Sequence, residues 1–210
     1  GIDSAGQNAI TVVAGANAEV SADDVAAVAA RLTRARVLLL QCETPAAASL
    51  AAARLVRDAG GVVILDPAPV PADGIAAFAG LAGVVTPNES EAAALTGIAV
   101  TSRDSAVAAA LCLRAMGFER AIVKCGGAGL VLAEGDSTAF IAPFPVVAVD
   151  TVAAGDCFNA GLAYALARGD RFAEAVRFAA ATGALAVTRK GAAEAAPTLR
   201  DVEKVLSGTP

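Results

Sequence analysis

Two carboxylates lie six residues apart in the stretch "AVDTVAAGDCFNAGLAYALARG", residues 148–169, on either side of a run of small residues. The segment "VVAVD" predicts a strand that ends at Asp150, and "GDCFNAGLAYALA" predicts a helix that begins near Gly155. Unpaired backbone N–H groups and the helix dipole together favour an anion at such a helix N-terminus. We therefore expect Ala153, Ala154 and Gly155 to let a phosphate approach the backbone closely.

Asp156 follows this small-residue run directly, and an ionised carboxylate beside an anion pocket can accept a proton from a substrate hydroxyl. Asp150 is suited to ligate a cation or to fix the loop. The structural alternative for Asp156 is an N-cap or first-turn acid, which helices favour in any case. The chain contains no histidine, so Ser-His and Cys-His machinery and His-ligated zinc are excluded.

The stretch "VDTVAAGDCFNAGLAYAL" resembles the C-terminal signature of the ribokinase-like (PfkB) family of sugar kinases. Six further segments resemble the same family in the same order: "VVAGANAEV" (12–20), "QCETP" (41–45), "DPAP" (66–69), "TPNESEAAALTG" (86–97), "VKCGGAGLVL" (123–132) and "AVTRKGAAEAAP" (186–197). The resemblance covers essentially the whole chain. It implies one kinase domain over residues 1–210, with a three-layer α/β/α fold, a mostly parallel central sheet and a C-terminal β-meander.

The activity implied by this resemblance is ATP-dependent phosphorylation of the primary hydroxyl of D-ribose to ribose 5-phosphate. Asp156 is implied to be the general base, and the amides of Ala153, Ala154 and Gly155 are implied to form the anion hole. Glu43, after the "LLLQC" run, is implied to contact sugar hydroxyls. Its alternative is an N-terminal helix acid beside Thr44 and Pro45.

Asn88 and Glu91 match the family's Asn-x-x-Glu element, which helps to place Mg²⁺-bound phosphates through ordered water. A helix cap followed by a first-turn glutamate is the alternative. The turn "KCGGAG" is implied to approach the nucleotide, although hairpins use the same residues. The full implied nucleotide-binding set is Asn88, Lys124, Cys125, Gly126, Gly127, Ala128, Gly129, Gly155 and Asp156.

An activating K⁺ is also implied, held by Asp150 and by backbone carbonyls of Val152, Ala186, Arg189 and Gly191. Ordinary helix C-capping explains "VTRKGA" as well. Two positions depart from the family pattern. Ala180 stands where a larger polar side chain often meets the adenine or its ribose, and Ala195 stands where a serine can help to ligate the monovalent cation.

The elements that position these residues alternate between short apolar runs and alanine-rich helical stretches, which is typical of an α/β fold with a parallel sheet covered on both faces. We expect a buried strand at 35–42 and further strands in "VVILDPAP", "GVVTP" and "RAIVKC". Glycine turns and alternation predict antiparallel strands over 126–150. The expected helices cover 45–58, 73–82, a segment ending at Gly97, 103–116, 155–168, 171–188 and "TLRDVEKVL".

Composition excludes several other classes of protein. The formal charge of −5 provides no basic face for a nucleic acid, and no run is apolar enough to predict a membrane span. Cysteines 42, 112, 125 and 157 have no C-x-x-C spacing and lie in apolar stretches, so we expect buried reduced thiols in a cytoplasmic protein.

Family members usually carry a further N-terminal part with the first sheet strands, sugar contacts and most of a lid. The chain is therefore interpreted as a fragment of a kinase or as a shortened protein. The apolar edge of its first strands is then exposed unless a partner chain or another segment covers it. The family also implies a homodimer.

The alternatives to phosphorylation of ribose are another PfkB kinase acting on a nucleoside, fructose or a ketodeoxy sugar acid, and a non-catalytic nucleotide-binding remnant. A P-loop NTPase is disfavoured because no G-x-x-x-x-G-K-[ST] motif occurs.

Overall fold

A six-stranded sheet in the order β1-β2-β3-β4-β5-β6 lies at the centre of the computed structural model, which describes residues 13–208. Strands β1 to β4 are parallel, and β4, β5 and β6 pair antiparallel. The predicted mostly parallel sheet with a C-terminal meander is thereby confirmed. The strands are β1 (Val37–Leu40), β2 (Val62–Leu65), β3 (Val84–Val85), β4 (Arg120–Lys124), β5 (Leu130–Glu134) and β6 (Ser137–Ile141).

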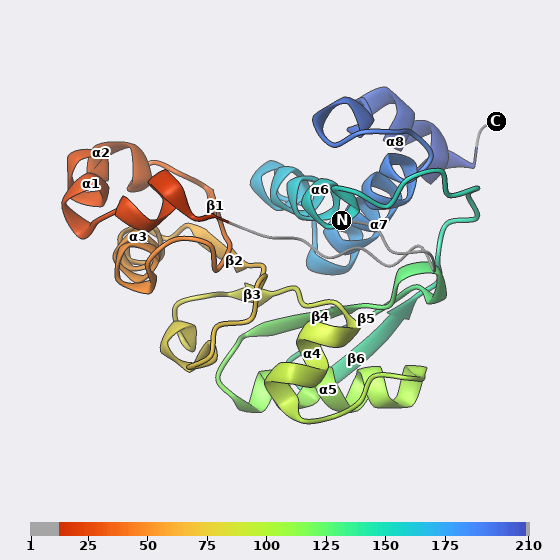
Figure 1. Cartoon of the computed structure of the whole chain (residues 1–210). Coiled ribbons are helices and arrows are strands. Elements are labelled where there is room, and N and C mark those ends of the chain that lie inside the picture. Colours follow the sequence, from red (N-terminus) through yellow and green to blue (C-terminus); the bar gives the residue numbers. More distant parts are fainter. Residues whose placement is uncertain (1–12, 209–210) are drawn as a thin grey trace.

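Alternate residues of each strand face opposite sides of the sheet and enter two separate hydrophobic cores. In β2, Val63 and Leu65 join the core under α3 (Ala46–Asp58), α4 (Glu89–Thr96) and α5 (Arg103–Ala115), whereas Ile64 joins the other core. That second core contains α6 (Ala154–Arg168), α7 (Phe172–Ala186) and α8 (Leu199–Ser207). Figure 1 shows the two helical layers on opposite sides of the sheet, so the three-layer prediction is confirmed.

Several helix ends follow the local sequence signals. Asn88 caps α4 in a capping box with Glu91, and α4 ends at Gly97, whose φ of 73° is the left-handed conformation that favours glycine. Ser102 caps α5 in the same way with Ser105. Two short helices precede β1: α1 (Ala22–Ala27) and α2 (Ala29–Leu32).

Two predicted elements are wrong. The expected helix at 73–82 is only a 3-10 turn, Ala76–Phe78, because Gly74 and Gly80 both take positive φ and interrupt a longer helix. Residues 142–150 form no strand: Pro143 and Pro145 have no N–H to donate to a sheet ladder. Asp150 therefore lies within the loop before residue 154 and does not end a strand.

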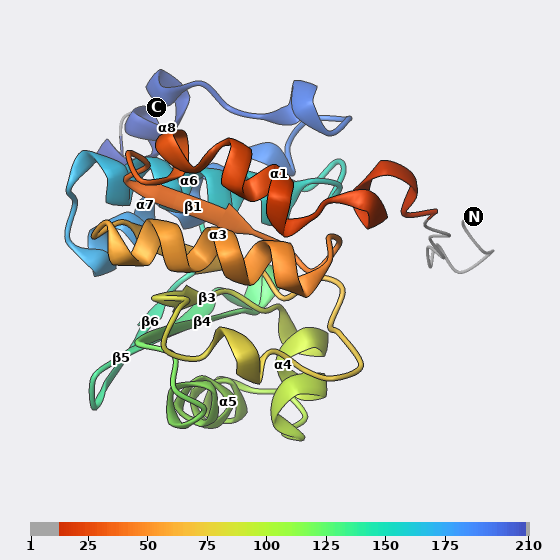
Figure 2. The same ribbon diagram turned by 90° about the vertical axis from the view of Figure 1, so that its left-hand side faces the viewer.

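The first strand is also more exposed than expected. Within residues 13–208, β1 pairs only with β2, and its Leu39 is 44% exposed. Figure 2 shows β1 beside α3 and α1 at this edge of the sheet. The expectation of a buried strand was therefore wrong, because no residue of β1 is buried and one of its edges has no strand beside it in the described part of the chain.

The four cysteines are free, as predicted, but only Cys157 is buried, and Cys42, Cys112 and Cys125 are half-buried. Burial raises the pKa of the Cys42 thiol to about 11, with Asp66 and Glu91 adding to the effect. No helix in the described range is long and apolar enough to cross a membrane. The family resemblance also implies that the chain begins, at "GIDSAGQNAITVV", in the return from the lid to the core, and nearly all of that stretch lies outside the described residues.

Candidate active site

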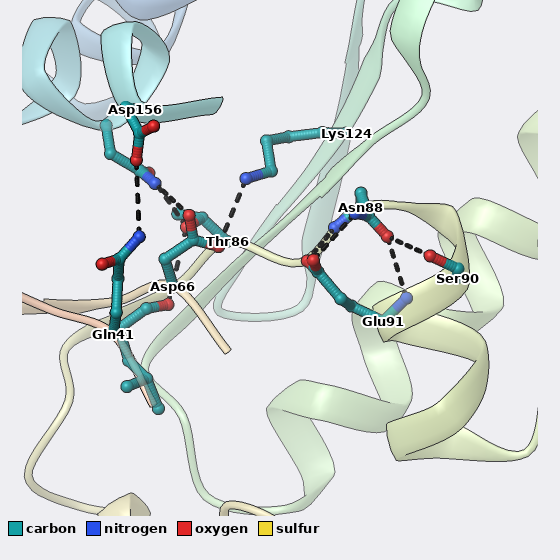
Figure 3. Close-up of polar contacts among 10 residues, drawn as sticks. Gln41, Asp66, Thr86, Asn88, Ser90, Glu91, Lys124 and Asp156 are labelled. Atoms are coloured by element: carbon teal, nitrogen blue, oxygen red, sulfur yellow. Dashed lines mark hydrogen bonds and ion pairs between the residues drawn. The ribbon is translucent and has the colours of Figure 1, made fainter. Parts of the chain in front are cut away.

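Polar side chains gather where the parallel strands end. Gln41 follows β1, Asp66 follows β2, Thr86 follows β3, and Lys124 is the last residue of β4. Carboxyl ends of parallel strands share one edge of a sheet, which is where open α/β folds bind ligands. Figure 3 shows these side chains converging below the first turn of α6, which carries Asp156.

The N-terminus of α6 is formed by the predicted small residues. Ala153 is its N-cap, with a φ of 58° in the left-handed region and no side-chain cap. Cys157 N–H donates to the carbonyl of Ala153 at 2.9 Å, whereas no acceptor within residues 13–208 takes the N–H of Gly155 or Asp156. Two adjacent backbone donors are therefore available to an anion at the positive end of a 15-residue helix.

A cavity of about 550 Å³ opens beside this helix end. Predicted site residues that line it are Asn88, Lys124, Gly126, Gly127, Gly129, Ala154 and Gly155. Cys125, Ala128 and Asp156, although predicted to bind nucleotide, do not line the cavity. Its other lining residues are mainly apolar and include Phe144, Ala180, Gly183 and Ala184, so one part suits phosphates and another suits a flat apolar group.

The carboxylate of Asp156 is exposed and lies beside Gln41, whose Nε2 is 3.4 Å from Oδ1. Gln41 was not predicted as a site residue, although it opens the "QCETP" segment. Glu43 is exposed in the bend between β1 and α3 and has no hydrogen bond or ion pair with another described residue. Its sugar-binding role therefore stays a prediction.

A buried polar network lies beneath Asp156, and sequence reasoning missed most of it. Asn159 Nδ2 donates to Asp66 Oδ2 at 2.6 Å, and Thr86 Oγ1 donates to Asn159 Oδ1 at 2.9 Å. Lys124 Nζ lies 3.3 Å from the other oxygen of Asp66. One available signal was a polar residue directly after each buried strand. Another was the three-residue spacing of Asp156 and Asn159, which places them on neighbouring positions of one helix face.

Burial raises the pKa of Asp66, an effect opposed by the positive charge of Lys124 and by hydrogen bonds from Lys124 and Asn159, and reinforced by the charge of Asp156. Asp66 is 7% exposed, so its carboxylate depends on these partners and not on water.

Asn88 and Glu91 are held in the capping box that was the structural alternative. Glu91 oxygens accept from the backbone N–H and from Nδ2 of Asn88, both at 2.8 Å, while Asn88 Oδ1 accepts from Glu91 N–H at 2.9 Å. Burial raises the pKa of Glu91. The pair lies at the same edge of the sheet as Lys124 (Figure 3), and its role toward phosphates stays a prediction.

No group of three or more acidic, cysteine or histidine residues suited to a metal occurs among residues 13–208. A Mg²⁺ ion bound here would take most of its ligands from nucleotide phosphates and water, which is its common binding mode. Asn88 and Glu91 fit the lesser role of contacting that hydrated ion.

Asp150 joins the two loops that were predicted to surround K⁺. Its Oδ1 accepts from Val152 N–H at 3.0 Å and its Oδ2 from Gly191 N–H at 3.1 Å. These backbone hydrogen bonds lower the pKa of Asp150, with Val152 as the larger cause. Arg189 N–H donates to Ala186 O at 3.1 Å, and Asp150 N–H donates to Val187 O at 3.2 Å, so the loop at Asp150 is hydrogen-bonded to the segment 186–191. Carbonyl and carboxylate oxygens are the ligand type that a hard cation takes, and the K⁺ site itself stays a prediction.

Ala180 and Ala195, the two departures from the family pattern, lie in different parts of the structure. Ala180 lines the apolar part of the cavity, so no side-chain hydrogen bond reaches a nucleotide from this position. Ala195 is fully buried in the 3-10 turn Ala193–Ala195.

A family model described as pfkB family carbohydrate kinase matches residues 2–199. The chain therefore belongs to this family, and the fold is the one shared by its solved structures. Among the relatives, the chain is 36% identical to a ribokinase from Haemophilus influenzae, covering 95% of this chain and 65% of that protein.

Two solved structures extend the comparison. A ribokinase from Thermotoga maritima superposes with a TM-score of 0.84 at 35% identity, covering 98% of this chain and 67% of the other. An Arabidopsis thaliana ribokinase complexed with ribose and ATP superposes with a TM-score of 0.85 at 32% identity and the same two coverages. The chain thus spans about two thirds of the length of these proteins, and 65% of the Haemophilus relative.

Proposed function

We propose that this protein is an ATP-dependent sugar kinase that phosphorylates the primary hydroxyl of D-ribose to ribose 5-phosphate. The observation that carries the proposal is the pair of unsatisfied N–H groups of Gly155 and Asp156, next to the exposed Asp156 carboxylate and the cavity. Ribokinase relatives, one of them solved with ribose and ATP, support the choice of substrates.

In the proposed reaction, the sugar hydroxyl gives its proton to Asp156 as its oxygen forms a bond to the terminal phosphorus of ATP. The bond from that phosphorus to the bridging oxygen breaks, and ADP leaves with the electron pair. The N–H groups of Gly155 and Asp156 stabilise negative charge on the phosphoryl oxygens during transfer. The left-handed conformation of Ala153 helps to keep these donors directed toward one point.

The other predicted residues have supporting roles. Gly126, Gly127 and Gly129 allow close backbone approach of the nucleotide in the cavity, with Lys124 and Asn88 at its polar end. When bound, Mg²⁺ neutralises phosphate charge, and Asn88 and Glu91 would contact its water shell. K⁺ would be held by Asp150 and the carbonyls of Val152, Ala186, Arg189 and Gly191, and would add positive charge near the anion hole. Cytoplasmic location and homodimer formation stay predictions.

The test is ribose-dependent release of ADP from ATP by the 210-residue chain with Mg²⁺ and K⁺. Replacing Asp156 by Asn keeps the side-chain shape and removes the base, so kcat is expected to fall by about 10²–10⁴-fold while ATP binding persists. Asp136→Asn, in the exposed turn before β6, is the matched control and retains wild-type turnover. Substituting other sugars and nucleosides for ribose decides between the kinase alternatives. Nucleotide binding without turnover on any acceptor would instead support the non-catalytic alternative.

A further inference from the structure

We infer that the ammonium group of Lys124 binds the phosphoryl group during its transfer and that Asp66 is the residue that positions this ammonium. The inference rests on the proposed function and deepens it, because it assigns the charge that complements the anion hole.

Lys124 lines the same cavity as the anion hole and lies close to it. A Cβ built on Gly155 would lie 3.6 Å from Lys124 Nζ, so the ammonium stands directly against the first turn of α6. The lysine side chain is 16% exposed and lines the cavity. The helix N-terminus and the ammonium, two positive groups, therefore lie close together, which favours an anion between them.

The ammonium has bonding capacity left for a ligand. The lysine ammonium carries three N–H donors, and Asp66 is its one hydrogen-bond acceptor among residues 13–208. The ring of Phe158 lies 5.9 Å from Nζ and closes another side of the ammonium without accepting a hydrogen bond. The remaining donors are thus available to phosphate oxygens beside Gly155.

Asp66 is itself firmly held. Its second oxygen accepts from Asn159 at 2.6 Å, and Asn159 is fixed in turn by Thr86 at 2.9 Å. Thr86 is fully buried and Asn159 is 5% exposed, so the chain of bonds connects strands β2 and β3 to helix α6 without solvent. Figure 3 shows that this series of hydrogen bonds ends at Lys124 and lies below Asp156. A carboxylate held in this way fixes the position of the ammonium relative to α6.

A purely structural ion pair explains these observations less well. Apolar residues of similar volume are often at least as stabilising as a buried ion pair, so a buried pair is weak evidence for a stability role. This pair also lies at the carboxyl ends of β2 and β4 and in neither hydrophobic core, and its Lys124 lines the cavity.

The test compares ATP with ADP, which lacks the transferred group. Lys124→Met is expected to weaken ATP binding by about 10-fold or more, the usual worth of a charged hydrogen bond, and to change ADP binding by less than about 2-fold. Where ribose-dependent turnover is measured, kcat falls by about 100-fold, as for loss of a transition-state donor. Arg120→Met is the matched control: it removes a cation at the other end of β4, where Arg120 pairs with Glu134, and leaves the ATP and ADP affinities unchanged.

Asp66→Asn separates a positioning role from a structural one. We expect kcat to fall by about 10-fold while KM for ATP does not rise, because the ammonium keeps its charge but loses its fixed place. Equal weakening of ATP and ADP by Lys124→Met, or wild-type kcat in Asp66→Asn, would overturn the inference. If the wild-type chain does not bind ATP, the proposed function itself is overturned. If the wild-type chain binds ATP but Lys124→Met weakens ATP and ADP equally, only the inference about Lys124 is overturned.

Discussion

The carboxylate of Asp150 accepts a hydrogen bond from the backbone N–H of Gly191 at 3.1 Å, although 41 residues separate the two in the sequence. The same carboxylate accepts from Val152 N–H through its other oxygen. One side chain therefore joins the loop before α6 to the loop after α7. These two hydrogen bonds give Asp150 a structural effect that an unfolding experiment can measure.

Asp150→Asn is expected to lower the free energy of unfolding at neutral pH, because an amide has one acceptor oxygen in place of two. The pKa of Asp150 is lowered in the folded state, so its stabilising contribution is complete above the ordinary value of 3.8 and is lost as pH falls through the lowered folded pKa. Urea unfolding at pH 7 and in acid should therefore show a difference from wild type that shrinks below pH 3.8. A difference that grows in acid would contradict this assignment. Asp136→Asn, in an exposed turn, should show neither effect.

Much of the fold was predictable because its signals are local. The short apolar runs in "VVIL" and "RAIVK" reflect strands that are buried on both faces. The capping residues Asn88 and Ser102 mark the starts of α4 and α5. The wrong predictions at 73–82 and 142–150 have a common cause. Apolar composition predicted a helix or a strand, whereas glycines at positive φ interrupt the first segment and prolines prevent strand pairing in the second.

The site was predictable only in part for a different reason. Gly155 and Asp156 form a contiguous motif, so their neighbourhood could be read from sequence. The network of Asp66, Asn159 and Thr86 joins positions up to 93 residues apart. A polar residue after each buried strand marks the edge of the sheet, but it does not show which of these side chains bond to one another. Only the order of the strands brings them to one edge.

The contact between Gln41 and Asp156 predicts a role in turnover. Gln41→Ala removes the donor to Oδ1 and is expected to lower kcat by about 2–10-fold, the worth of one net hydrogen bond. Gln41→Glu is expected to be worse, because a second negative charge would lie beside Asp156 and repel the phosphoryl group. Steady-state kinetics with ATP and ribose measure both. Glu43→Gln is the contrasting variant, and it should raise KM for ribose if Glu43 binds the sugar. A rise in KM for ribose caused by Gln41→Ala would contradict a role of Gln41 in turnover.

The close packing of α6 on α7 depends on Gly161. A Cβ there would lie 2.6 Å from Thr182 Oγ1 and 3.2 Å from the Cα of Ala179, and the latter belongs to the backbone of α7 and cannot rotate away. Gly161→Ala is therefore expected to destabilise the protein by about 1–2 kcal/mol, even though alanine is the better helix former. Thermal or urea unfolding measures the loss. Gly127→Ala, which meets no atom within 4 Å, is the control and should leave stability nearly unchanged.

Ala153 carries backbone strain at the helix end that holds the proposed anion hole. Its φ of 58° is a conformation that costs an alanine about 1–2 kcal/mol and a glycine little. Ala153→Gly should therefore raise the free energy of unfolding, by less than this amount because glycine also gains freedom in the unfolded chain. The same change frees the loop before Gly155, so kcat is expected to fall while the unfolding midpoint rises. Gly60, also at positive φ but remote from the cavity, provides the reverse control: Gly60→Ala should lower stability without altering kcat. A more stable Ala153→Gly enzyme with undiminished kcat would show that the strained backbone does not orient the N–H groups for phosphoryl transfer.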